Sequence, residues 1–159
     1  MEFELLANIK EMRLLYTQSF TQAGQRHDLS QPEIDVLLFV ANQPQYNTAR
    51  DIANRRGLAK SNISTAVEML RQKELLEVCE DEKNRRVRRL FPTAKAEPVI
   101  EELRACQAAF FGKLFDGFTP EELAQLERLM QHAAENLHRQ VSGGAEPAQD
   151  TSRAGNPRG

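Results

Sequence analysis

The chain has 159 residues, 40% of them hydrophobic, a formal net charge of −2 and no tryptophan. This length suits one domain with its own hydrophobic core, and the slight negative charge excludes a protein that is drawn to polyanions by bulk charge alone. No apolar run approaches the roughly 20 residues of a membrane span, no secretory signal is seen, and two cysteines form neither a disulfide framework nor a metal cluster. We therefore expect a cytoplasmic protein with no membrane association.

Two helices are predicted in the first part of the chain. Residues 2–23 place apolar side chains at helical spacing, in a stripe wider than one packing partner requires. Residues 24–29 are predicted to form a polar connector. Ser30 and Glu33 then have the spacing of a capping box, and the helix that they open is expected to run to about Asn42. The middle of this helix is almost entirely apolar, which predicts burial on most of its sides.

A helix-turn-helix is predicted over residues 48–73. Thr48 is expected to cap its first helix, and Gly57 supplies the positive backbone angle that the tight turn requires. The second helix is predicted from Leu58 to Lys73. Its apolar side chains share one edge, and its opposite face carries Lys60, Ser61, Asn62, Ser64, Thr65, Glu68 and Arg71. The side chains at the start of this face are short, as close entry into a DNA major groove requires.

Two strands joined by a charged tip are predicted between Leu75 and Phe91. Residues 50–95, which include this hairpin and the helix-turn-helix, hold 12 of the 21 Lys and Arg residues but only 7 of the 23 Asp and Glu residues. Positive charge is therefore concentrated where the DNA-binding geometry is predicted. Four arginines of the hairpin are expected to face DNA, with a merely solvated surface as the alternative: Arg85, Arg86, Arg88 and Arg89.

Two further helices are predicted after the hairpin. The first runs from Thr93 to about Phe115, and the second from Thr119, the start of a Thr-Pro-Glu-Glu cap signal, to about Gln140. Residues 142–159 are rich in Gly, Pro, Ala and Ser and lack apolar periodicity, so we expect them to form a disordered tail.

Residues 1–141 are therefore expected to form one domain, with a DNA-reading module over residues 30–91. The apolar stripes of the helices at 2–23 and 93–141 exceed what this small module can cover. They are predicted to be dimerisation helices that pack against a second copy of the chain. A monomer whose terminal helices wrap the module is the alternative.

This order of parts resembles the multiple-antibiotic-resistance regulator (MarR) family of bacterial transcription factors. The resemblance covers about residues 3–140, and its most specific parts are residues 58–67 and the hairpin tip at residues 81–86. It implies a mainly α fold with a small β-hairpin wing, in which N- and C-terminal dimerisation helices flank a winged helix-turn-helix domain. Two departures from the family pattern are Thr65, where many members have arginine, and Glu74, where a glycine usually ends the recognition helix.

The resemblance also assigns roles to individual residues. Arg86 is expected to enter the minor groove, and Asp81 to hold the shape of the wing and its arginines. The predicted DNA-binding residues lie on the second helix of the motif and at the wing tip: Lys60, Ser61, Asn62, Ser64, Thr65, Arg71, Lys83, Asn84, Arg85 and Arg86.

These features predict a sequence-specific transcriptional regulator that binds double-stranded DNA at a palindromic operator as a homodimer. The resemblance further implies a ligand-responsive repressor, with a small-molecule effector in a cleft between the dimer helices and the DNA module. Tyr16 and Arg13 are candidates for that cleft, with dimer packing and surface charge as the alternative. The alternative function is a non-specific architectural or protein-interaction module with the same winged fold.

The sequence contains no recognisable catalytic or metal-binding motif. It has no phosphate-cradling glycine loop, nucleophile elbow or metalloprotease histidine pair, so we expect neither an enzyme nor a cofactor. His27, His132 and His138 lack the spacing and partners of a metal site. Cys79 and Cys106 are expected to be packing or surface residues, with redox sensing as the alternative.

Overall fold

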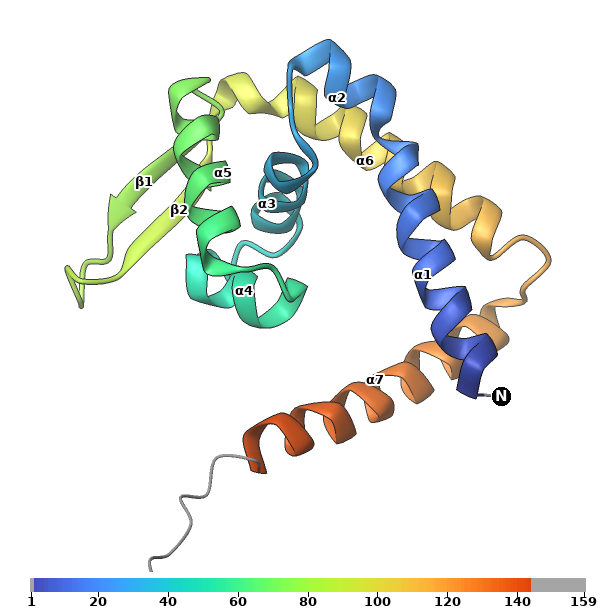
Figure 1. The fold of residues 1–159 in the computed structure, drawn as a ribbon. Coiled ribbons are helices and arrows are strands. Elements are labelled where there is room, and N and C mark those ends of the chain that lie inside the picture. Colours follow the sequence, from blue (N-terminus) through green and yellow to red (C-terminus); the bar gives the residue numbers. More distant parts are fainter. Residues whose placement is uncertain (1, 144–159) are drawn as a thin grey trace, which may run out of the picture. The chain divides into compact units, whose positions relative to one another are not determined.

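The computed structural model describes residues 2–143, which form seven α-helices, a two-stranded hairpin and one short 3-10 helix (Figure 1). In chain order these elements are α1 (Glu2–Ser19), α2 (Thr21–His27), α3 (Gln31–Asn42), α4 (Ala49–Arg56), α5 (Lys60–Gln72), β1 (Leu76–Glu80), β2 (Arg88–Pro92), the 3-10 helix η1 (Ala94–Ala96), α6 (Glu97–Leu114) and α7 (Pro120–Gly143). The chain divides into two units after Leu114, so that α7 belongs to a unit of its own. The predominance of helices with one antiparallel hairpin confirms the predicted fold class.

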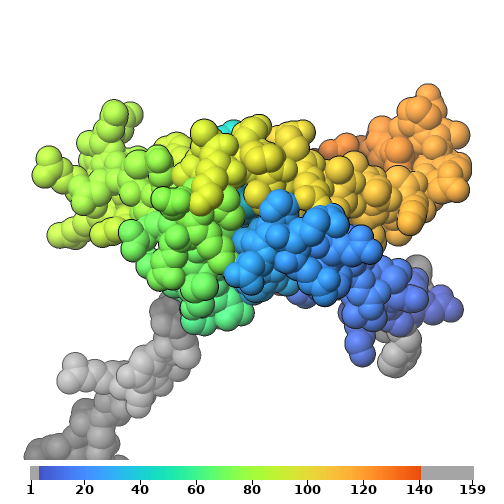
Figure 2. Space-filling view, turned by 90° about the horizontal axis from the view of Figure 1, so that it is seen from above, coloured from blue at the N-terminus to red at the C-terminus, as the bar shows by residue number. Residues whose placement is uncertain are grey.

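Helix α3 lies at the centre of the hydrophobic core of the first unit. Almost all its side chains from Ile34 to Val40 are buried, as its continuous apolar sequence predicts. Helices α5 and α6 and strand β2 pack around it. Helix α6 also contacts α1 and α2, and Figure 2 shows α2 and α6 lying against each other on one face of this unit.

The first predicted helix is interrupted, which corrects the sequence prediction. We expected one helix over residues 2–23 and a connector over residues 24–29, but α1 and α2 meet at a break at Phe20, and only a short link joins α2 to α3. The side chain of Phe20 is completely buried at this break. Gly24 lies inside α2, where an added Cβ would stand 3.0 Å from the carbonyl oxygen of Leu29. The glycine is therefore a packing residue and does not end the helix.

The local signals around the helix-turn-helix are confirmed. The N–H and hydroxyl groups of Ser30 donate to the carboxylate of Glu33 (2.8 and 2.6 Å) at the start of α3. At the start of α4, the Asp51 N–H donates to the hydroxyl of Thr48 at 3.2 Å, and the Thr48 N–H donates back to the Asp51 carboxylate at 3.2 Å. Gly57 ends α4 with a φ of +63°, the left-handed conformation that favours glycine.

The hairpin has the predicted two strands and charged tip. Strands β1 and β2 are antiparallel, with Leu76 opposite Pro92 and Glu80 opposite Arg88. Leu76 and Leu90 are buried, so the base of the hairpin is anchored in the core. The hairpin projects from the helices on the side of α5 (Figure 1).

The two C-terminal helices begin close to their predicted signals. The segment from Thr93 forms η1 first and becomes α-helical at Glu97. Pro98 therefore lies in the first turn of α6, where its missing N–H removes no helical hydrogen bond. At the start of α7, the Glu122 N–H donates to the hydroxyl of Thr119 at 3.2 Å, which confirms that cap.

Helix α7 continues to Gly143 and thus passes the predicted end near Gln140. Of the predicted disordered tail, residues 144–159 lie outside the described residues, and the predicted domain limits stay predictions. Within residues 2–143, none of the helices has the length and apolar character needed to cross a bilayer.

Glu74 is a strained position and gives a first prediction. It lies between α5 and β1 with a φ of +59°, where a Cβ is crowded by the backbone, and its exposed ion pair with Lys95 adds little stability. We predict that Glu74→Gly raises the melting temperature by about 2–4 °C, because relief of strain outweighs the added freedom of the unfolded chain. Glu74→Ala is the matched control, since it removes the ion pair but keeps the Cβ. A melting temperature of Glu74→Gly that is equal to or lower than that of Glu74→Ala contradicts this explanation.

Candidate nucleic-acid interface

Helix α5 presents the polar face that the sequence predicts. It begins at Lys60 instead of Leu58, and it buries Ile63, Ala66 and Leu70 against the core. On its other face the following side chains are exposed: Lys60, Ser61, Asn62, Ser64 and Thr65. The packing of α5 on α3 therefore leaves a row of mostly short polar groups on the surface of the first unit.

Arg71 is also exposed, but it is engaged by its own helix. Its Nε and Nη2 atoms donate to the Glu68 carboxylate at 3.1 and 2.9 Å, and Gln72 donates to the same carboxylate at 3.1 Å. Hydrogen bonds from Arg71, and then from Gln72, lower the pKa of Glu68. A contact between Arg71 and a DNA phosphate thus requires the arginine to exchange one anionic partner for another.

The tip of the hairpin is shaped by the side chain of Asp81. Its Oδ1 atom accepts the backbone N–H groups of Lys83 (2.9 Å) and Asn84 (3.0 Å), and its own N–H donates to the carbonyl oxygen of Val87 at 2.9 Å. The pKa of Asp81 is lowered first by its hydrogen bond from Arg89 and then by that from the Lys83 N–H. One carboxylate therefore organises the backbone of the tip, the role that the family resemblance assigns to it.

The four arginines of the hairpin divide into two groups. Arg85, Arg86 and Arg88 are exposed. Arg89 instead donates through Nε to Asp81 and through Nη1 to the Oδ1 atom of Asn47 at 2.8 Å. The sequence predicts that Arg89 faces DNA together with the other three arginines. Its contacts show instead that it supports the hairpin.

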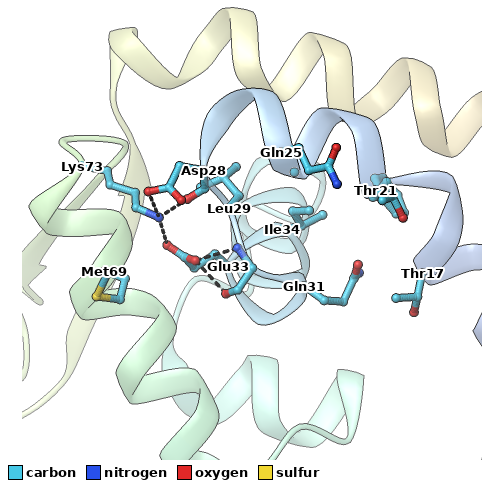
Figure 3. A pocket seen from close by; sticks show the side chains of 13 residues that line it. Thr17, Thr21, Gln25, Asp28, Leu29, Gln31, Glu33, Ile34, Met69 and Lys73 are labelled. Atoms are coloured by element: carbon cyan, nitrogen blue, oxygen red, sulfur yellow. Dashed lines mark hydrogen bonds and ion pairs between the residues drawn. The ribbon is translucent and has the colours of Figure 1, made fainter.

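A buried ion pair ties the end of α5 to the start of α3. Lys73, which follows α5, lines one edge of a hollow of 610 Å³ beside α2. Figure 3 shows its side chain turned toward Asp28 and Glu33. Its Nζ atom donates to Oε1 of Glu33 at 2.7 Å and to the carbonyl oxygen of Asp28. Burial alone would raise the pKa of Glu33, but hydrogen bonds from Lys73 and Ser30 outweigh burial and lower the pKa. Sequence reasoning identified Glu33 only as a cap, because its partner lies 40 residues further along the chain.

Comparisons with known proteins agree with this geometry. A family model described as the MarR family matches residues 27–87, from the end of α2 to the wing tip. An uncharacterised HTH-type transcriptional regulator, YsmB of Bacillus subtilis (strain 168), is 25% identical over 133 residues, which cover 81% of this chain and 91% of YsmB. Residues 27–87 therefore match the MarR family, the family that the sequence resembles.

Solved structures of MarR-family type share the fold. A MarR-family transcriptional regulator from Silicibacter pomeroyi has a TM-score of 0.71 at 16% identity, over 80% of this chain and 86% of the other. CouR from Rhodococcus jostii RHA1, solved bound to p-coumaroyl-CoA, has a TM-score of 0.67 at 22% identity, over 82% and 89% of the two chains. These structures confirm the predicted fold, and the match of residues 27–87 to the MarR family supports the broad class of DNA-binding transcriptional regulator.

Tyr16 joins helices α1 and α6 of this chain. Its ring lies edge-on to Phe20 and Phe110, with centroids 4.9 and 5.3 Å away, and its hydroxyl accepts a hydrogen bond from Gln107 at 2.9 Å. These contacts connect α1 to α6 within one chain. The placement of Tyr16 and Arg13 beside an effector cleft stays a prediction.

The remaining candidate residues are scattered over the fold. Cys79 is exposed on β1 and Cys106 is half-buried on α6. His27 lies 2.7 Å from Glu102, whereas His132 and His138 are exposed on α7. No group of three metal-binding side chains occurs in the part of the chain that the structure describes.

The Glu33–Lys73 pair gives a second prediction. Lys73→Met leaves a charged carboxylate buried without its partner and should lower the free energy of unfolding at pH 7 by about 2–4 kcal/mol. Lys95→Met is the control, because it removes an exposed lysine from an exposed pair and should cost little.

The pH dependence of this loss is the more specific measurement. In the native chain the lowered pKa of Glu33 stabilises the fold above the unfolded pKa, and this stabilisation is lost as the pH falls through the folded value. In Lys73→Met, burial should raise the pKa of Glu33. Protonation of Glu33 then removes the buried negative charge and the destabilisation that it causes. The difference between native chain and variant should therefore shrink between pH 7 and pH 4.5 in urea unfolding. A difference that is constant with pH contradicts the buried ion pair.

Proposed function

We propose that this chain is a sequence-specific transcriptional regulator that binds a palindromic operator as a homodimer and represses until a small-molecule effector binds. The observation that carries the proposal is the presence of two exposed polar surfaces on one rigid unit, the outer face of α5 and the tip of the β1–β2 hairpin. A winged helix-turn-helix uses such surfaces to reach a major groove and a neighbouring minor groove at the same time.

The face of α5 supplies the proposed contacts in the major groove. The amide of Asn62 suits the paired donor and acceptor of adenine, and the hydroxyls of Ser61 and Ser64 suit either donors or acceptors on base edges. Lys60 contacts phosphate and adds affinity through counterion release. Thr65 offers a methyl group where an arginine would read guanine, so we propose that this position favours contact with a thymine methyl.

The wing tip supplies the proposed contacts in the minor groove. Arg86 enters the groove, where a narrow A·T-rich segment has the most negative potential. Lys83, Asn84 and Arg85 lie beside it on the exposed tip and contact the flanking backbone. Asp81 accepts hydrogen bonds from the backbone of the tip. Because the tip is already ordered in this way, less conformational entropy is lost when it binds DNA.

Exposed apolar side chains support the homodimer. They are Leu5, Leu6, Ile9, Met12, Leu14 and Leu15 on α1, and Leu129, Met130 and Leu137 on α7. Groups of exposed apolar side chains of this kind mark interaction surfaces. A second copy related by two-fold symmetry would cover them and would place two α5 helices about 34 Å apart, one turn of DNA.

Effector control is supported by a relative. CouR was solved with p-coumaroyl-CoA bound, so a protein of this fold holds a small organic ligand. A ligand that changes the distance between the two α5 helices of a dimer would change operator affinity. A tenfold change in occupancy requires only about 1.4 kcal/mol of difference in binding between the two states.

Selection of bound duplexes from random DNA tests the proposed function. The full chain should enrich an inverted repeat with half-sites about one helical turn apart, and should bind it about 1,000-fold or more tightly than a scrambled duplex at the same salt. Equal binding to both duplexes would instead indicate the architectural module. Failure to retain any duplex would reject DNA binding.

The wing assignment gives a third prediction. Arg86→Ala should weaken binding to the selected duplex by about 1–3 kcal/mol without lowering the melting temperature, because the side chain is exposed at the tip. Lys113→Ala removes an equal charge from α6 and is the matched control for bulk electrostatics. Equal losses of duplex affinity in Arg86→Ala and Lys113→Ala would show that Arg86 acts only through its charge.

The dimer gives a fourth prediction. Leu6 is 68% exposed on α1, and Leu6→Glu would place a charge in the proposed interface. Sedimentation equilibrium should then show monomers at a concentration where the native chain is dimeric. A variant that still sediments as a dimer rejects this part of α1 as an interface.

A further inference from the structure

Asn47 is a buried polar residue outside any helix or strand. The residue is 3% exposed, and it directly precedes Thr48, the residue that caps α4. Its carbonyl oxygen accepts the Leu90 N–H at 2.8 Å, and the next residue, Thr48, forms an antiparallel bridge with Arg89. The segment of Asn47 and Thr48 thus lies along β2 like a very short third strand.

The side chain of Asn47 continues this attachment toward the wing tip. Its Oδ1 atom accepts Nη1 of Arg89 at 2.8 Å, and the same guanidinium donates through Nε to Asp81. Asp81 in turn accepts the backbone N–H groups of Lys83 and Asn84. A continuous chain of hydrogen bonds therefore runs from the start of the helix-turn-helix to the tip of the hairpin.

A two-stranded hairpin needs such attachments because it is marginally stable in isolation. Leu76 and Leu90 hold the base of the hairpin in the core, but the tip between β1 and β2 is exposed. Among the contacts described above, the one from Asn47 to Arg89 is the link that joins the helix-turn-helix to the residues shaping the tip. The angle between wing and α5 should therefore depend on it.

We propose that Asn47 is a positioning residue for DNA recognition. Through Arg89 and Asp81 it holds the wing tip in the orientation that delivers Arg86 to the minor groove, while its own buried side chain stays away from DNA. This inference rests on the proposed function and names a specificity-supporting residue within it.

Asn47→Ala cuts the side-chain link and leaves the rest of the attachment in place. The bond from the Leu90 N–H to the carbonyl oxygen of residue 47 belongs to the backbone and survives the change. The Arg89 side chain is 40% exposed, so water replaces the lost partner and no buried charge is stranded. We therefore expect a folded variant with altered wing positioning.

A double-mutant cycle with Arg86 separates positioning from a merely structural role. On the selected duplex, Asn47→Ala should weaken binding about tenfold in the native background, but less than about twofold when Arg86 is already alanine. A general loss of stability would give the same loss in both backgrounds. Such additive losses would overturn the proposal.

Two further measurements sharpen the test. Asn47→Asp keeps an acceptor oxygen toward Arg89 and should restore affinity to within about threefold of the native chain. Gln45→Ala, an exposed change in the same connection, is the matched control and should leave affinity unchanged. Lack of rescue by Asn47→Asp in a variant that melts like the native chain counts against the proposal.

Hydrogen exchange tests the link without DNA. The amide hydrogens of Lys83 and Asn84 should exchange at least about five times faster in Asn47→Ala than in the native chain. Without Asn47, Arg89 no longer fixes the position of Asp81, which accepts hydrogen bonds from these two amides. Unchanged exchange would overturn the link. If the native chain selects no duplex, the proposed function fails, whereas native binding with additive losses in the cycle overturns only the role of Asn47.

Discussion

The attachment of β2 to the segment of Asn47 and Thr48 is the constraint on which the DNA-binding geometry depends. It fixes the hairpin to the start of α4, while the apolar edge of α5 packs on the buried helix α3. Helix α5 and the wing are thereby parts of one unit, although they are separate segments of the chain. A protein that contacts two neighbouring grooves benefits from this attachment. A wing that moved independently would lose conformational entropy each time the protein bound DNA.

Helix α5 is held at both of its ends by different physical means. At its start, the left-handed Gly57 sets the turn from α4, and at its end the buried Glu33–Lys73 pair joins it to α3. The pair is costly to desolvate, so its contribution is better understood as fixing one arrangement of the two helices than as added stability. A shift in the link between α2 and α3 would therefore be transmitted to the end of the recognition helix.

The parts of the fold that follow from neighbouring residues were predictable from sequence. The caps at Ser30 and Thr48, the turn at Gly57 and the hairpin all depend on signals within a few positions. The break at Phe20 and the packing of Gly24 depend on how the chain folds back on itself. The supporting role of Arg89 depends on Asn47, which lies 42 residues away in the sequence. Charge and periodicity predict the proposed DNA-binding surface, but they could not distinguish an arginine that faces solvent from one that supports the tip.

In the proposed complex, α5 and the wing contact two grooves of each half-site at once. Methylation interference on the selected duplex tests it directly, since dimethyl sulfate marks guanine N7 in the major groove and adenine N3 in the minor groove. Guanine methylation within each half-site and adenine methylation beside it should both block binding. Interference confined to a single groove would contradict this arrangement.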